Sequence, residues 1–260
     1  EIADLLSEEL QLPRIEPKGN SDISVSSNKY RSIRTSGPES LRHFKKTFTQ
    51  ALKRTVSEGT YNSKNPVVFP IKQDKRYRSS KPIRVPKYQA VIIYIMDVSG
   101  SMGAEEKQLA RLTSFWTDVW LRRNYDFLKS RYIIHNYNAV EVDQHTFYHT
   151  SEGGGTRIAA AYELVKEIIH TDYYPEEWNI YIQQYSDGDD WGGSSQAACN
   201  HIADLAKVVN QIAYCQVNDR GEFKKLFDSR FHSHESVIST SVYNKDGVLK
   251  AIKELFTAGT

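Results

Sequence analysis

The sequence predicts an α/β protein whose main domain contains a doubly wound, mostly parallel sheet with helices on both faces. Three observations lead to this fold class. Residues 91–96 form an apolar run without in/out alternation, which is typical of a strand buried on both faces of a parallel sheet. From Gln89 onward, strand-like and helix-like segments alternate, as parallel crossovers require. Carboxylates, hydroxyls and glycines follow the apolar runs, at the sheet edge where ligands bind in such folds.

The N-terminal third differs from the rest in composition, so we predict a basic extension of helices and linker over residues 1–84, followed by the α/β domain over residues 85–260. Residues 1–90 hold 18 Lys/Arg against 9 Asp/Glu, whereas the remainder holds 16 against 23. Apolar spacing and proline positions set the expected elements of the extension. These are an acidic helix over 1–12, a linker over 13–37, a helix over 38–57 and a strand over 67–71.

Each element of the α/β domain is predicted from its own pattern. A helix begins at Ala104, because the next apolar residues recur at helical spacing. Two short strand patterns around Asn136-Tyr-Asn138 predict an antiparallel edge hairpin over 131–135 and 139–142. The later elements follow in alternation. They are a helix over 157–170, a strand over 179–185, a helix over 198–209, a strand over 212–217, a helix over 223–231, a strand over 237–240 and a helix over 246–256.

Three predicted loops at one edge of the sheet carry oxygen ligands. Asp97, Ser99 and Ser101 follow the first strand, Thr156 ends a glycine loop before a helix, and Asp187 follows the 179–185 strand. Hard oxygen ligands of this kind suit Mg²⁺ or Mn²⁺ better than a soft metal. Each residue also has a purely structural alternative. The hydroxyls and Asp97 could cap helices or form turns, and Asp187 could be a turn residue before Gly188.

These loops resemble the metal-ion-dependent adhesion site of the von Willebrand factor A (VWA) domain. That site combines an Asp-x-Ser-x-Ser motif with a threonine from a second loop and an aspartate from a third. The matching positions here are Asp97, Ser99, Ser101, Thr156 and Asp187. The chain is more specifically similar to the YeaH/YhbH family of bacterial VWA proteins. The stretches that carry this resemblance are Met96–Met102, Glu141–Phe147, Gly154–Arg157, Trp178–Tyr181 and Ser186–Asp189.

The resemblance implies a cytoplasmic protein associated with sporulation and stress, which binds another protein through Mg²⁺ or Mn²⁺. The partner would offer an acidic side chain to the ion, and an AAA+-type serine protein kinase is the partner class that the family implies. We do not expect an enzyme, because none of the three motifs contains a base to activate water. A metal-dependent hydrolase, with Asp187 or Asp189 as the base, stays open as an alternative.

Several function classes are disfavoured by the sequence. Nucleic-acid binding through the basic extension is a second alternative, but its aromatic residues are scattered rather than set as a stacking platform. No apolar run is long enough to cross a bilayer, so we expect no membrane contact. Cys199 and Cys215 lack metal-type spacing and are expected to be free thiols. His145 and His149 would lie too far apart for one ion in an extended segment. The chain begins with Glu1, so we expect it to be part of a longer protein.

Overall fold

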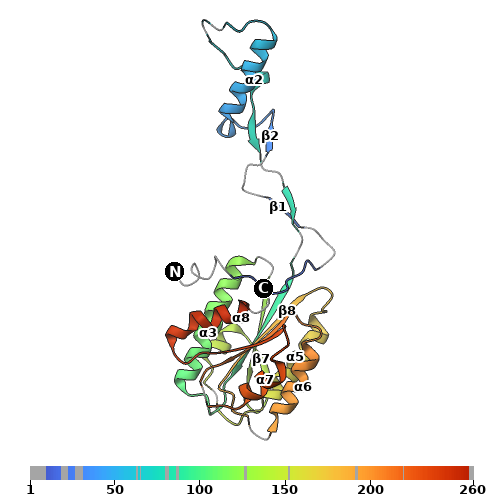
Figure 1. Cartoon of the computed structure of the whole chain (residues 1–260), viewed down its shortest axis with the longest axis vertical. Helices are drawn as coiled ribbons and strands as arrows, with labels where there is room; N and C mark the ends of the chain where they lie inside the picture. The colour runs from blue at the N-terminus through green and yellow to red at the C-terminus, as the bar shows by residue number, and fades with distance from the viewer. Residues whose placement is uncertain are drawn as a thin grey trace. The chain divides into compact units, whose positions relative to one another are not determined.

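The structure is a computed structural model that divides into two compact units, residues 21–86 and residues 1–20 with 87–260 (Figure 1). It describes residues 10–18, 23–26, 32–62, 64, 66–79, 82–85, 88–125, 128–151, 153–190, 193–218 and 220–257. Most of the predicted acidic helix over 1–12 lies outside these residues. Among the described residues, no helix combines the length and apolar character needed to cross a bilayer.

The larger unit is built on a six-stranded sheet in the order β10-β9-β8-β5-β6-β7. All neighbouring strands run parallel except β6 and β7, which form the predicted antiparallel edge hairpin. The predicted fold class, α/β with a doubly wound and mostly parallel sheet, is therefore confirmed. The strands are β5 (Ala90–Asp97), β6 (Leu128–His135), β7 (Ala139–Val142), β8 (Asn179–Ser186), β9 (Gln211–Gln216) and β10 (Val237–Ser241).

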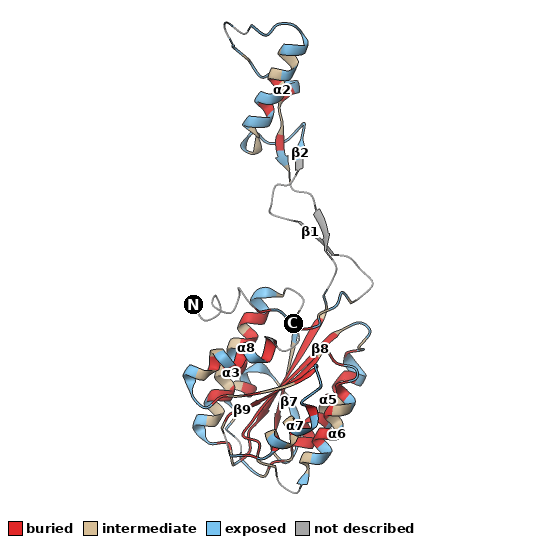
Figure 2. Ribbon diagram, in the orientation of Figure 1, coloured by how far each residue is buried: buried red, intermediate tan, exposed pale blue. Residues whose placement is uncertain are grey.

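Helices cover both faces of this sheet and create two separate cores. β5 and β8 are buried along their whole length, and Figure 2 shows β8 in red. This burial results from alternate side chains entering opposite cores. One core lies against α3 (Ala104–Asn124), α4 (Gln144–His149) and α8 (Val248–Thr257), which follows the 3₁₀ turn η4 (Lys245–Gly247). The other core lies against α5 (Ile158–Asp172), α6 (Ser195–Leu205) and α7 (Phe223–Phe231).

Residues 10–18 pack on the α/β unit, which corrects the predicted extension over residues 1–84. Leu10 and Leu12 are buried in the core that contains α3 and α8. The Tyr181 hydroxyl donates a hydrogen bond to the Pro13 carbonyl at 2.9 Å, and Asn179 exchanges hydrogen bonds with the backbone of residue 16. The physical reason is burial: these leucines lose contact with water only by packing on the sheet.

The smaller unit, residues 21–86, pairs strands from its two ends. β1 (Ile23–Ser26) pairs with β4 (Pro82–Val85), and β2 (Ser32–Arg34) pairs with β3 (Tyr77–Ser79), both antiparallel. The predicted linker over 13–37 therefore contains two strands, which only long-range pairing reveals. The predicted helix over 38–57 is divided into a 3₁₀ turn and an α-helix. These are η1 (Glu39–Leu41) and α2 (Phe44–Ser57).

The predicted strand over 67–71 is wrong. The described residues 66–71 form an irregular segment that leads into a 3₁₀ turn, η2 (Lys72–Asp74). Pro66 and Pro70 flank the apolar residues of this segment, and a proline cannot donate to a strand ladder. The apolar run was therefore a poor guide to pairing here.

Candidate metal site

The candidate site lies where the order of the sheet reverses. The chain passes from β5 to β6 on one side and later adds β8 on the other side of β5. The helices that follow β5 and β8 therefore cover opposite faces, and ligands bind at the carboxyl ends of the strands at such a point in open α/β sheets. Asp97 ends β5, and Asp187 directly follows β8, so the topology brings these two predicted residues to the same edge.

The loop after β5 holds its three predicted residues in one cluster. The Ser99 N–H donates to Asp97 Oδ1 at 2.9 Å, and Ser99 Oγ lies 3.0 Å from Ser101 Oγ. Asp97 and Ser99 are fully buried, whereas Ser101 is half-buried. These contacts turn the backbone so that one carboxylate and two hydroxyls share a small volume.

The glycine loop before α5 contacts the loop after β5 through its backbone. The Gly100 N–H donates to the Gly154 carbonyl at 2.9 Å, and a Cβ at Gly100 would lie 3.3 Å from that oxygen. Gly154 has φ +131°, a conformation that side chains rarely allow. Thr156, two residues later, is buried at the same edge. Gly100, Gly103, Gly153 and Gly154 are all exposed, so the edge faces solvent.

The loop after β8 is held in place by the backbone of Gly221, which approaches it closely. Gly188 has φ +79°, and the Asp187 carbonyl accepts the Gly221 N–H at 3.2 Å. A Cβ at Gly221 would lie 2.1 Å from the Gly188 carbonyl carbon. Only glycine fits at position 221 without moving the loop. Sequence patterns did not identify this residue, because its constraint comes from a long-range contact.

Asp97 and Asp187 form a buried pair of carboxylates. Burial, followed by the charge of Asp97, raises the pKa of Asp187 to about 6, although hydrogen bonds from the Asp189 N–H and the Ser101 hydroxyl act in the opposite direction. Two carboxylates beside the Ser99 and Ser101 hydroxyls are suitable donors for Mg²⁺ or Mn²⁺, and the buried Thr156 lies on the neighbouring glycine loop. In the described part of the chain, no group of three or more His, Cys, Asp or Glu side chains is placed to hold an ion. The predicted set contains only two such residues, since its other members are hydroxyls.

Two basic side chains of α3 lie beside this site. Burial lowers the pKa of Lys107, while the charges of Asp97 and Asp187 act in the opposite direction. Burial also lowers the pKa of Arg111, whose guanidinium donates to the Thr150 carbonyl in front of the glycine loop. The site therefore combines the buried carboxylates of Asp97 and Asp187 with the basic side chains of Lys107 and Arg111 on α3.

Two polar residues at the site were not predicted. The Ser186 hydroxyl donates to Asp97 Oδ2 at 2.7 Å and accepts the Gly188 N–H at 3.0 Å, so it links the first and third loops. Asp190 accepts the Ile158 N–H at 3.2 Å and the hydroxyls of Ser194 and Ser195. Ser186 ends β8 and Asp190 follows it closely, and this position at the carboxyl end of a buried strand is the signal that could have identified them.

The histidines take different positions from those expected. His145 and His149 lie on α4 rather than in an extended segment, and their stacked rings are 4.2 Å apart between centroids. Only Phe147 of α4 is buried, so the helix has almost no apolar pattern. His135 pairs with Asp97 across the sheet and is buried. Cys199 and Cys215 are buried free thiols, as expected.

Comparison with known proteins identifies relatives along most of the chain. A family model described as "Protein of unknown function (DUF444)" matches residues 57–259. A UPF0229 protein of Halalkalibacterium halodurans is 30% identical over 264 residues, covering 98% of this chain and 65% of that protein. A UPF0229 protein of Ruminiclostridium cellulolyticum is 36% identical over 193 residues, covering 72% and 48%. The chain thus spans less than two thirds of the length of these relatives.

A solved structure supports the fold. The crystal structure of the SpRpn10 VWA domain matches with a TM-score of 0.52 and 10% sequence identity, covering 66% of this chain and 97% of that one. At this identity the likeness concerns the fold alone. The α/β unit is therefore VWA-like, with the candidate site at the carboxyl edge of its sheet.

Proposed function

We propose that this chain, which belongs to the family described as "Protein of unknown function (DUF444)", is a divalent-metal-dependent protein-interaction module. The family description names no role, so the proposal rests on the geometry of the chain's own loops. Asp97, Ser99, Ser101, Thr156 and Asp187 would hold Mg²⁺ or Mn²⁺ as a metal-ion-dependent adhesion site. The observation that carries this proposal is the buried pair of carboxylates, whose mutual repulsion a divalent ion would remove.

The same donor set favours binding over catalysis. Asp97 and Asp187 would offset the two charges of the ion, and the hydroxyls add none, so a further carboxylate can approach without strong repulsion. Lys107 and Arg111 on the α3 side would attract such an anion. His135 is the base placed beside Asp97 by strand register, but it is buried at 1% exposure and its Nε2 lies 3.4 Å from Gln184 Nε2. It is poorly placed to activate a metal-bound water.

The partner would be a protein that presents an acidic side chain to the ion. The resemblance to the bacterial YeaH/YhbH proteins extends this proposal to a cytoplasmic stress or sporulation pathway, with an AAA+-type serine protein kinase as the candidate partner. The attraction between this acidic side chain and the metal site would determine partner specificity and association rate more than total affinity.

A pull-down of the candidate kinase tests this proposal. The full chain should retain the kinase in Mg²⁺ and release it in EDTA, and Thr156→Ala should weaken retention without unfolding the domain. The last expectation holds because this change removes a neutral ligand and leaves both carboxylates in place. Retention that survives both EDTA and Thr156→Ala would mean that the partner binds another face, and the proposal would be wrong.

A further inference from the structure

The unit formed by residues 21–86 leaves most of its large apolar side chains exposed. Within the part that the structure describes, its buried apolar residues are Ala51 and Tyr77. By contrast, Phe44 is 68% and Phe69 is 75% exposed. Other exposed apolar side chains of the unit are Ile33, Phe48, Val56, Val67 and Ile71. An apolar surface of this extent on a small unit indicates an interaction site.

Two of these side chains, Phe44 and Phe48, line an open cavity. The cavity has a volume of about 450 Å³ and is lined by Arg42, Phe44, Lys45, Thr47, Phe48 and Pro70. Its volume falls within the range of binding clefts, about 300–1,000 Å³. Phe44 and Phe48 lie one helical turn apart on α2, and Pro70 comes from the segment that precedes η2. The cavity therefore lies between a helix and a loop.

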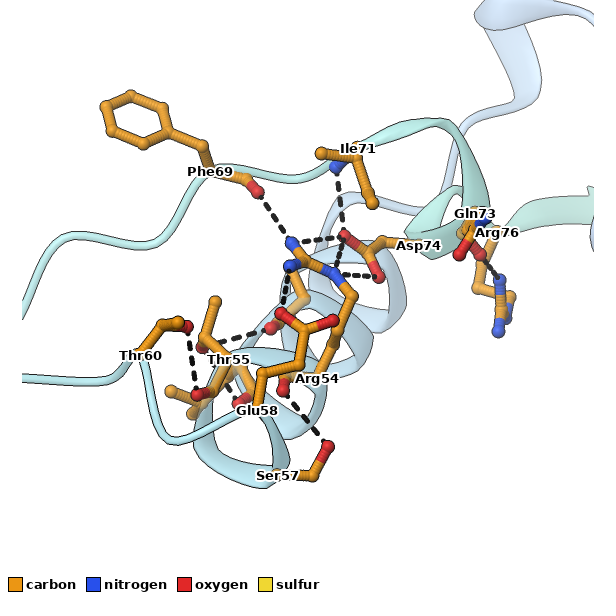
Figure 3. A network of polar contacts seen from close by, with 12 residues as sticks. Arg54, Thr55, Ser57, Glu58, Thr60, Phe69, Ile71, Gln73, Asp74 and Arg76 are labelled. Carbon is orange, nitrogen blue, oxygen red and sulfur yellow. Dashed lines mark hydrogen bonds and ion pairs between the residues drawn. The ribbon is translucent and has the colours of Figure 1, made fainter.

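A charged network holds that loop against α2 (Figure 3). Arg54 donates from Nε and Nη2 to the Asp74 carboxylate at 3.1–3.2 Å, and from Nη2 to the Phe69 carbonyl at 3.1 Å. The Ile71 N–H donates to Asp74 Oδ2 at 2.9 Å. In Figure 3 the Phe69 ring points away from this network. The backbone around Pro70 is thus fixed while the neighbouring apolar side chains remain exposed.

The surroundings of the cavity are strongly basic. Residues 21–86 contain 15 Lys/Arg and 4 Asp/Glu. Three of the four acidic residues already have basic partners: Glu39 contacts Arg42 and Lys75, while Glu58 and Asp74 contact Arg54. No carboxylate of the described residues pairs with Lys45 or Lys46, and both lysines are exposed on α2. Positive charge is therefore available next to the apolar cavity.

We propose that this cavity binds an acidic amphipathic segment of a protein partner. Its apolar side chains would contact Phe44, Phe48 and Pro70, and its carboxylates would pair with Lys45 and Lys46. A peptide that combines apolar and acidic side chains matches a cavity that has apolar walls and exposed lysines beside it. Nucleic acid is the competing ligand class, because Phe48 and Phe69 also expose rings on which a base could stack, and the test below separates the two. This surface contains none of the proposed metal ligands and is independent of them.

Fluorescence anisotropy with the full chain in EDTA tests the proposal. The probe is a labelled helical peptide with Leu at i, i+3, i+4 and i+7 and Glu elsewhere. The comparison probes have Lys in place of Glu, or Gln in place of Leu, and a fourth is an oligothymidylate of about 20 nucleotides. We expect the acidic amphipathic peptide to bind at least about tenfold more tightly than the others. Phe48→Ser should weaken binding of the acidic amphipathic peptide by about tenfold or more. The double variant Lys45→Glu with Lys46→Glu should weaken it by a similar factor.

Tyr243→Ser is the matched control, because Tyr243 is an aromatic residue of the other unit and is 63% exposed. It should leave peptide binding unchanged. The charge-reversal variant keeps the test valid if Phe48→Ser fails to fold, since both lysines are exposed. Absence of binding, equal binding of the Gln-substituted peptide, or tighter binding of the oligonucleotide would each overturn the proposal. Self-association that Phe48→Ser abolishes would overturn it in favour of a second copy as the occupant.

Discussion

The Asp97 carboxylate accepts one hydrogen bond at each oxygen, from the Ser99 N–H and from the Ser186 hydroxyl. These donors fix its orientation and leave its remaining lone pairs for an ion. Residues that orient a ligand without touching the metal commonly account for about 10–100-fold in metal affinity. Ser186 is therefore a positioning residue of the proposed site.

Replacing Ser186 tests this role. Ser186→Ala removes the 2.7 Å bond to Asp97 and should weaken Mn²⁺ binding by about 10–100-fold in a calorimetric titration. Ser194→Ala is the control, because the Ser194 hydroxyl also donates to an aspartate nearby, at Asp190. It should leave Mn²⁺ affinity within about twofold of the original, since Asp190 is not among the proposed ligands. Equal effects of the two changes would contradict the role given to Ser186.

At the scale of elements, the loop after β8 depends on its contact with Gly221. Gly221→Ala places a Cβ 2.1 Å from the Gly188 carbonyl carbon, so the backbone must move. We expect a loss of about 1–3 kcal/mol in unfolding free energy and weaker Mn²⁺ binding. Gly153→Ala is the control, because nothing lies within 4 Å of a Cβ there. Denaturant unfolding of both variants measures the difference, and a Gly221→Ala protein as stable as the control would contradict this account.

The Arg54–Asp74 pair predicts an acid-sensitive α2. Burial acts to raise the pKa of Asp74, but hydrogen bonds from Arg54 and the Ile71 N–H, with the charges of Arg54 and Arg76, lower it below its ordinary value of 3.8. A carboxyl whose folded pKa is lowered contributes stability above its unfolded pKa and loses it as pH falls through the folded value. NMR signals of α2 should therefore show a lower melting temperature below about pH 4. Asp74→Asn should remove this dependence; a persisting acid transition would exclude Asp74 as its source.

Several elements could be predicted because their patterns are local. The apolar runs of β5 and β8 require burial on both faces, and the polar residues that follow them determine the edge of the site. Other features depend on distant partners. β1 and β2 form only by pairing with β4 and β3, and Gly221 is required only because Gly188 approaches it. No local pattern contains that information.

At the scale of the whole molecule, the two units make different predictions for deletions. Lys18 and Tyr88 form a β-bridge, which brings the two ends of the segment 21–86 close together. When residues 21–86 are deleted, a flexible linker of about eight residues can therefore join the remaining chain. This variant should keep the melting temperature and Mn²⁺ affinity of the α/β unit. Truncation of residues 1–88 also removes Leu10 and Leu12 from the core and should cost several kcal/mol, at about 2–5 kcal/mol for each buried leucine. Thermal unfolding measures the stability of the two variants. Equal stability would contradict the placement of Leu10 and Leu12 in the core of the α/β unit.

The proposed metal site is tested most directly by Mn²⁺ titration of three proteins that span residues 1–260. The original chain and Asp189→Asn should each bind a single ion, and excess Mn²⁺ at about one hundred times Kd should stabilise both by about 2.7 kcal/mol. Asp189 is the control because it is a neighbouring carboxylate outside the proposed ligand set. Asp97→Ala should lose both the binding and the shift in melting temperature. Undiminished Mn²⁺ binding by Asp97→Ala would place the ion elsewhere and contradict the account.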